Sequence, residues 1–261
     1  MDRNIYVDTH AHIMSHEYEE DLNEMLARCE EAGVERIMII TLSHEETMKA
    51  IAFAEKDPSR FNVAAGIFPE DVKELTDEMW EEFKETVKHP MISCIGEIGL
   101  DYYWEKDPEV RALQREVFIK QIELAKEVNK PILVHSRDAM QDTYDIMKAH
   151  HWKGLLHCFS GTKEMAREFT KLGYYIALGG ALTFKNARHS VEVCESIDEK
   201  YLLSETDCPY MAPVPYRGKR NEPSYIPLIV KKMAEVRGES EEHMASVILA
   251  NWERFLRSCE E

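Results

Sequence analysis

The chain has 261 residues, 44% of them hydrophobic, and a formal net charge of −17. This acidity argues against broad electrostatic binding to nucleic acid or to an anionic membrane, although it leaves room for a small basic site or for a polyanion held through a metal. The sequence contains neither a run of ~18 apolar residues nor an apolar signal-peptide core, so we expect a cytoplasmic protein without a membrane anchor. The six dispersed cysteines form no C-x-x-C pair, and we expect them to be reduced.

Short apolar runs alternate with charge-rich amphipathic stretches along the whole chain. The apolar runs predict strands at about 5–9, 36–42, 62–68, 92–98, 131–135, 154–158, 174–179 and 201–205. Helical spacing of apolar residues is clearest over 113–128, and 18–31 and 71–88 have a similar pattern. Asp71 and Ser240 are typical of helix starts, whereas Gly33 and Gly173 are typical of helix ends.

Eight strands that alternate with helices predict a parallel sheet, and at this length we expect the sheet to close into one (β/α)8 TIM barrel spanning residues 1–261. Segment 208–227 contains five of the ten prolines. We expect it to form a long, stiff loop after the eighth strand. Two final helices, at about 224–237 and 240–257, are expected to follow it.

Imidazole and carboxyl groups stand at the ends of several predicted strands. A buried group of this kind is costly unless it is paired or bound to a metal. Because parallel strands of a barrel end at one rim, we expect these side chains to converge there and to suit Zn, Mn or Mg. The residues are His10, His12, Glu97, His135, His157 and Asp207.

Neighbouring residues suggest supporting roles. Side chains alternate along a strand, so Asp8 is expected on the same side as His10, as a ligand or as a partner of the ligands. Gly96 and Gly99 flank Glu97 and favour close approach of the backbone to a ligand. The alternative for Glu97 is an internal salt bridge, for example to Arg137. Asp207 is a candidate proton acceptor, and Glu205 is a candidate partner or auxiliary base.

Six segments resemble, in order, the motifs of the TatD family of metal-dependent hydrolases and DNases, which belongs to the amidohydrolase-like TIM barrels. They are Asp8-Thr9-His10-Ala11-His12, Gly96-Glu97-Ile98-Gly99-Leu100-Asp101-Tyr102, His135-Ser136-Arg137-Asp138-Ala139, His157-Cys158-Phe159-Ser160-Gly161, Glu205-Thr206-Asp207-Cys208-Pro209-Tyr210 and Arg217-Gly218-Lys219-Arg220-Asn221-Glu222-Pro223. The resemblance implies two divalent ions, Mg, Mn or Zn, bridged by Glu97. His10, His12 and Asp207 complete one site, and His135 and His157 complete the other.

The resemblance also implies cleavage of DNA phosphodiesters from a 3′ end, with Asp207, Glu97 and Glu205 as the catalytic carboxylates. Basic and aromatic residues near the expected rim are candidate contacts to single-stranded DNA ends, which we expect to bind locally and weakly. The candidate contacts are Arg137, Tyr102, Tyr103, Trp104, Arg217, Lys219, Arg220 and Asn221. Two alternatives stay open: a metal-dependent hydrolase of another ester, such as a small phosphoester or an aminoacyl ester, and a non-catalytic barrel that binds a partner.

Overall fold

The computed structural model describes residues 3–260 and contains one eight-stranded parallel sheet, with the strands in sequence order. The strands are β1 (Tyr6–Ala11), β2 (Val34–Thr41), β3 (Phe61–Ala65), β4 (Ile92–Asp101), β5 (Ile132–Arg137), β6 (Gly154–Leu156), β7 (Tyr175–Leu178) and β8 (Leu202–Ser204). Bonds between the first and last strands close the sheet. Thr9 Oγ1 donates to the carbonyl of Ser204 (3.1 Å), and Ala11 pairs with Cys208 in a parallel bridge.

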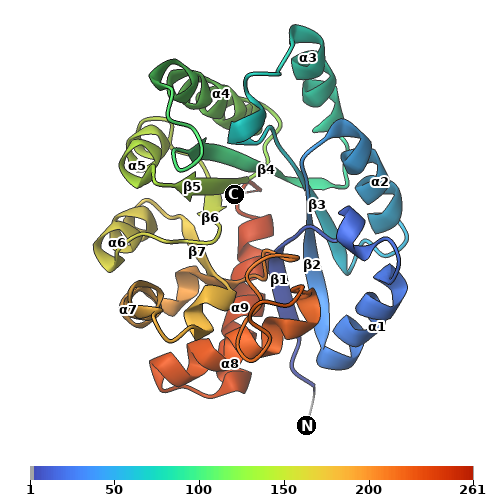
Figure 1. Ribbon diagram of the computed structural model, residues 1–261, viewed down its shortest axis with the longest axis vertical. Coiled ribbons are helices and arrows are strands. Elements are labelled where there is room, and N and C mark those ends of the chain that lie inside the picture. Colours follow the sequence, from blue (N-terminus) through green and yellow to red (C-terminus); the bar gives the residue numbers. More distant parts are fainter. Residues whose placement is uncertain (1–2, 261) are drawn as a thin grey trace.

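Helices surround the strands (Figure 1). They are α1 (Leu22–Ala32), α2 (His44–Ala54), α3 (Asp77–Thr86), α4 (Pro108–Glu127), α5 (Met140–Ala149), α6 (Lys163–Lys171), α7 (Arg188–Ser196), α8 (Ile226–Arg237) and α9 (Glu241–Leu256). The fold is therefore the (β/α)8 TIM barrel that the alternation predicts. Among residues 3–260, no helix has the length and apolarity needed to cross a membrane. All six cysteines are free thiols, as expected.

Helix ends follow local capping chemistry, with one correction. The Ser240 hydroxyl accepts from the amide of His243 at the start of α9, and Gly33 ends α1 at φ +84°, as predicted. The predicted start at Asp71 is wrong, because this residue ends a short 3-10 turn (Pro69–Asp71). Helix α3 begins after Thr76, whose hydroxyl accepts from the amide of Met79.

Strand pairing is irregular in β1 and β4 near the predicted ligands His10 and Glu97. The register of β1 against β2 shifts between Asp8 and Ala11, and that of β4 against β5 shifts between Ile95 and Ile98. Such irregularities re-aim side chains and are common beside active sites. These shifts in pairing lie beside His10 and Glu97, and the side chains of His10 and His12 still meet.

Glycines allow the strands to approach one another at this point. A Cβ on Gly99, at φ +140°, would lie 2.0 Å from the carbonyl oxygen of His135, and a Cβ on Gly96 would lie 2.5 Å from Cβ of Leu133. The close approach predicted for these glycines is thus to strand β5 and not to a ligand. It seats Glu97 against the strand that carries His135.

Candidate metal centre

All six predicted ligands meet at one place in the barrel. Nε2 of His10 lies 3.2 Å from Nε2 of His12, 3.2 Å from Oε2 of Glu97 and 3.6 Å from Oδ1 of Asp207. Nε2 of His12 lies 3.7 Å from the same Glu97 oxygen and 3.6 Å from the same Asp207 oxygen. We call these four residues the first ligand group.

The other oxygen of Glu97 faces a second ligand group. Oε1 of Glu97 lies 2.9 Å from Nδ1 of His135 and 2.9 Å from Nε2 of His157. These two imidazole nitrogens are 3.1 Å apart. Glu97 therefore divides its carboxylate between the two groups, and the alternative salt bridge to Arg137 is not present among its described contacts.

The spacing of these atoms suits divalent ions. Tetrahedral coordination with bonds of about 2.1 Å would separate ligand atoms by about 3.4 Å, and octahedral coordination would separate neighbouring ligands by about 3.0 Å. The first group, at 3.2–3.7 Å, is close to the former value, and the second, at 2.9–3.1 Å, is close to the latter. The imidazole and carboxylate donors are those that Zn and Mn accept.

The protonation states of two carboxylates favour cations. Burial opposes ionisation of Glu97, but the nearby imidazoles of His157 and His10 and the hydrogen bonds from His10 and His135 hold its pKa well below its usual range. Burial favours a higher pKa for Asp207, but the hydrogen bond from His12 and the nearby imidazole of His10 outweigh it, so the pKa of Asp207 is lowered. Both carboxylates are therefore anionic at neutral pH.

The first imidazole is neutral. Burial and the charge of His157 lower the pKa of His10 to about 4. The ring of His10 is therefore uncharged at neutral pH, and neutral imidazole is the form that binds a metal.

Two further carboxyl groups lie behind the ligands, and one of them is hydrogen-bonded to a ligand. Nε2 of His135 donates to Oδ2 of Asp101 at 2.9 Å, which leaves Nδ1 facing Glu97. Glu205 is fully buried, lies 3.8 Å from Nδ1 of His157 and accepts from the amide of Cys158. His10, His157 and Glu205 also form a third set of potential ligands, which shares both imidazoles with the other groups. Burial and the charge of Asp207 raise the pKa of Glu205 well above its usual value.

Asp8 is not among the potential ligands, but it is hydrogen-bonded to residues beside them. Its carboxylate accepts from the amide and hydroxyl of Thr206 and from the amide of His10. Burial raises its pKa to about 7, and the hydrogen bonds from Thr206 oppose that shift. Asp8 thus connects the end of β1 to the segment that carries Asp207.

Some of the predicted substrate contacts are exposed to solvent, and others are buried. Arg137 is exposed and its guanidinium lies 3.9 Å from the ring centre of Tyr103 and 5.7 Å from that of Trp104, which are 43% and 62% exposed. Tyr102, in contrast, is only 8% exposed, and its hydroxyl donates to Asp142. Its ring is therefore not open to a base.

The proline-rich loop after β8 holds the other predicted contacts. Arg217 is exposed beside Phe184, and Lys219 is exposed beside Tyr216. Arg220 makes a bidentate pair with Asp21, at 2.8 and 2.6 Å. Asn221 is fully buried, and its amide donates to the carbonyls of Thr206 and Tyr210. Arg220 and Asn221 therefore brace the loop, and neither is free to meet a substrate.

Sequence reasoning missed three residues at the site. Asp101 ends β4 in the same way as the ligands end their strands, so the pattern itself contained the signal. Tyr210 is 58% exposed with its ring 6.3 Å from that of His12, and the ring of Phe68 lies 5.0 Å from that of His135. Nothing in the local sequence distinguished these aromatic rings from ordinary loop residues.

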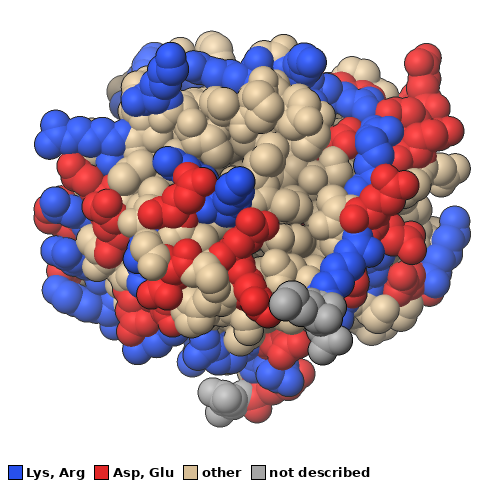
Figure 2. All heavy atoms as spheres, turned by 90° about the horizontal axis from the view of Figure 1, so that it is seen from below, with Lys and Arg blue, Asp and Glu red and all other residues tan. Residues whose placement is uncertain are grey.

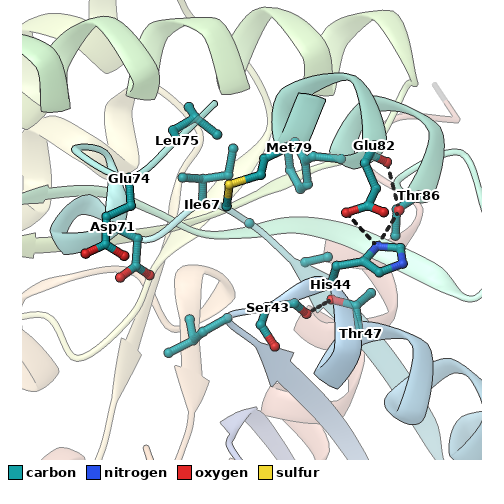
Figure 3. Close-up of a pocket in the computed structure, with 14 residues that line it drawn as sticks. Ser43, His44, Thr47, Ile67, Asp71, Glu74, Leu75, Met79, Glu82 and Thr86 are labelled. Atoms are coloured by element: carbon teal, nitrogen blue, oxygen red, sulfur yellow. Dashed lines mark hydrogen bonds and ion pairs between the residues drawn. The ribbon is translucent and has the colours of Figure 1, made fainter. Parts of the chain in front are cut away.

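A pocket of about 290 Å³ opens elsewhere, between α2, α3 and the end of β3 (Figure 3). Apolar side chains such as Ile67 and Met79 line it together with the carboxylates of Asp71, Glu74 and Glu82. None of the potential ligand groups among the described residues includes a residue of this pocket. Its carboxylates disfavour an anionic ligand, so we do not place the reaction there.

Comparison with known proteins decides the family. The family described as TatD related DNase matches residues 7–257. The chain belongs to the TatD family of metal-dependent hydrolases. It is 41% identical to the uncharacterized metal-dependent hydrolase YabD of Bacillus subtilis, over 96% of this chain and 98% of that one. It is 34% identical to the uncharacterized metal-dependent hydrolase YcfH of Escherichia coli, over 95% and 94% of the two chains.

A solved structure supports the same assignment. The TatD homologue YJJV of Escherichia coli K12 superposes with a TM-score of 0.89 at 28% identity, over 96% of this chain and 97% of that one. The TatD family relationship thus covers the entire barrel, including every strand that carries a ligand. The ligand groups described above are therefore those of a metal-dependent hydrolase.

Proposed function

We propose that this TatD-family hydrolase is a two-metal deoxyribonuclease that acts on single-stranded DNA ends. The observation that carries the proposal is the division of Glu97 between two ligand groups, with one oxygen 3.2 Å from His10 and the other 2.9 Å from His157. A carboxylate shared in this way is typical of sites that hold two ions about 3.5–4 Å apart, as in many nucleases. The proposal that cleavage starts from a 3′ end is based on the family resemblance.

Divalent ions supply Lewis-acid chemistry and lower the pKa of a coordinated water when they are bound. The chain itself supplies the proton acceptor. Asp207 has the most accessible carboxylate of the two groups, with 17% of its side chain exposed against 5% for Glu97. Since the pKa of Asp207 is lowered, its carboxylate is ionised and can accept a proton from an attacking water.

Glu205 has a different role in this proposal. It is fully buried behind His157 and cannot receive a proton directly from a water in the mouth of the barrel. We assign it to positioning, because it accepts from the amide of Cys158, the residue that follows the ligand His157.

The substrate side of the site favours a flexible anionic strand. Tyr103 and Trp104 offer exposed rings on which bases can stack, and Arg137 lies over them as a phosphate partner. Basic and acidic side chains are interspersed over the face shown in Figure 2. That face is a side of the barrel and not its mouth. With a net charge of −17, we expect the chain to bind DNA weakly, locally and in a salt-sensitive way.

A direct assay tests the proposal. Protein loaded with Mg, Mn, Zn or Co is incubated with single-stranded DNA labelled at either end and, separately, with small phosphoesters and aminoacyl esters. Stepwise shortening from the 3′ end, lost in Asp207→Asn but present in the surface variant Lys120→Ala, is expected. Turnover of the small esters alone would refute the nuclease. A folded Asp207→Asn protein that matches wild type in every assay would indicate a non-catalytic barrel.

A further inference from the structure

A second pocket, of about 240 Å³, lies on the β6–β8 side of the barrel. Its walls come from the segment after β6, the 3-10 turn Gly180–Thr183 after β7, the start of α7 and the loop after β8. We call it the β7 pocket. Its lining residues are Cys158, Phe159, Ser160, Leu178, Gly179, Ala181, Leu182, Phe184, Asn186, Ala187, His189, Ser190 and Met211.

The lining of the β7 pocket includes residues that stand next to the candidate metal centre in the chain. Cys158 directly follows the ligand His157, and its amide donates to Glu205. Its thiol lies 3.6 Å from the sulfur of Met211, four residues after Asp207. The lining of the pocket and the second ligand group are therefore neighbours along the chain at Cys158 and His157.

The lining combines apolar faces with polar edges. Leu182, Phe184 and Met211 supply apolar and aromatic surface, and Asn186 and Ser190 supply hydrogen-bonding groups. No acidic residue is among the described residues that line it, in contrast to the pocket between α2 and α3, which has three carboxylates. Of these two pockets, the β7 pocket is therefore the one whose lining does not repel a nearby phosphate.

Size restricts the occupant to a single ring system. Pockets that enclose drug-sized ligands measure about 300–1,000 Å³, and the β7 pocket is smaller. Flat rings with a polar edge are read in proteins by stacking on apolar or aromatic side chains and by hydrogen bonds to the edge. Asn186 can both donate and accept, which matches the mixed edge of a nucleobase.

We propose that the β7 pocket binds the nucleobase of the nucleotide at the scissile phosphodiester. This inference rests on the proposed nuclease function and adds to it a subsite for one base. Arg217, whose guanidinium lies 4.3 Å from the ring centre of Phe184, stands at the pocket edge, where it can contact a neighbouring phosphate.

Contacts between the walls of the β7 pocket preform it without a ligand. Thr183 Oγ1 accepts from the amide of Val214 at 2.8 Å, which ties the turn after β7 to the loop after β8. Gly180 packs so closely that a Cβ there would lie 2.0 Å from the carbonyl oxygen of Met211. A preformed pocket lowers the entropic cost of binding a small group.

Binding without metal tests the subsite separately from catalysis. Saturation-transfer NMR is measured on the full chain with deoxyadenosine, thymidine and 2-deoxyribose. We expect the base protons to receive at least threefold more saturation than the sugar protons. Ala187→Trp and Ser190→Phe, two alternative fillings of the pocket, are expected to abolish that difference. Glu195→Trp, on the same helix but outside the pocket lining, is the matched control and is expected to keep it.

Cleavage assays complete the test. Loaded wild-type protein is given oligonucleotides that end in either a normal nucleotide or an abasic residue. We expect kcat/KM to be at least tenfold higher for the normal end, and the ratio to approach one in the pocket-filling variants, with thermal unfolding confirming that each is folded. Equal saturation of base and sugar, or unchanged ratios in both filled variants, would overturn the subsite. Base binding without cleavage of any DNA would instead refute the nuclease and leave the subsite standing.

Discussion

Asp101 accepts a hydrogen bond from Nε2 of His135 at 2.9 Å, and this contact turns Nδ1 of the imidazole toward Glu97. The other oxygen of Asp101 accepts from the amides of Tyr103 and Trp104. One buried carboxylate thus orients a candidate metal ligand and also accepts from the turn that carries the two exposed aromatic rings. The candidate ion site and the candidate strand contact are coupled through it.

The first prediction concerns this carboxylate. Asp101→Asn keeps an oxygen that can accept from His135 but removes the charge, so we expect the affinity of the second ligand group for Zn or Mn to fall about 10- to 100-fold. Calorimetric titration measures the affinity. Asp142→Asn, which removes a carboxylate bonded to Tyr102 and touching no ligand, is the control. Equal affinities in the two variants would show that Asp101 does not orient the site.

The second prediction concerns the pH dependence of ion-free stability. Burial favours a lower pKa for His135, but the hydrogen bonds to Asp101 and Glu97 outweigh it and raise the pKa to about 9. Because the folded pKa exceeds the unfolded value of about 6.5, the imidazolium stabilises the fold fully below pH ~6.5, and that contribution is lost as the pH rises through 9. The free energy of unfolding should therefore fall by at most about 3 kcal/mol across this window.

Urea unfolding at a series of pH values, with a chelator present, measures this fall. His135→Asn should flatten the slope between pH 6.5 and 9, whereas the exposed control His243→Asn should keep it. If His135→Asn has the wild-type slope, His135 is not the group responsible. Since ion binding needs the unprotonated imidazole, added Zn should stabilise the protein more as the pH rises.

The third prediction concerns the exposed guanidinium over Tyr103. Arg137→Ala removes one phosphate partner, so we expect the affinity for single-stranded DNA to fall about 3- to 10-fold and the slope of log K against log salt to decrease in magnitude by about 0.7. Fluorescence anisotropy in an Asp207→Asn background avoids cleavage. Lys120→Ala, on α4 and paired with Glu116, is the control. A salt slope unaffected by Arg137→Ala would remove this residue from the binding path.

The fourth prediction concerns Arg220, which is structural here. Its hydrogen bond lowers the pKa of Asp21 to about 2. Because the folded pKa is below the unfolded value, the pair stabilises the protein above pH ~4, and this contribution is lost as the pH falls toward 2. One third of the Asp21 side chain is exposed, so solvent screening reduces the expected loss in Asp21→Asn to about 1 kcal/mol at neutral pH.

Thermal and acid unfolding measure that loss. The curves of wild type and Asp21→Asn should converge near pH 2, and Asp145→Asn, at an exposed site on α5, should follow wild type throughout. A variant that is as stable as wild type at pH 7 would show that the pair does not brace the loop.

The strand ends explain why the barrel and the ligand groups could be predicted. Several apolar runs end in a polar group, and parallel strands of a barrel end at the same rim. The sequence therefore predicts that His10, His135 and Asp207 lie close together. The orientation of Asp8 could not be predicted in the same way. It depends on a register shift in β1 and on donors from Thr206, 198 residues away.

The loop contacts show the same limit. Arg220 and Asn221 have the composition of a phosphate-binding segment, but their partners Asp21 and Thr206 come from other parts of the chain. Tyr102 is likewise buried by its bond to Asp142, whereas its neighbours Tyr103 and Trp104 are exposed. Exposure of a loop side chain depends on distant packing partners, which one sequence does not reveal.

Anomalous diffraction from crystals soaked in manganese tests the central claim most directly. The account predicts two peaks about 3.5–4 Å apart, one on each side of the Glu97 carboxylate, with His10, His12 and Asp207 around one and His135 and His157 around the other. Glu97→Gln crystals should lose or weaken both peaks. The absence of any peak between these side chains in the wild-type protein would contradict the account.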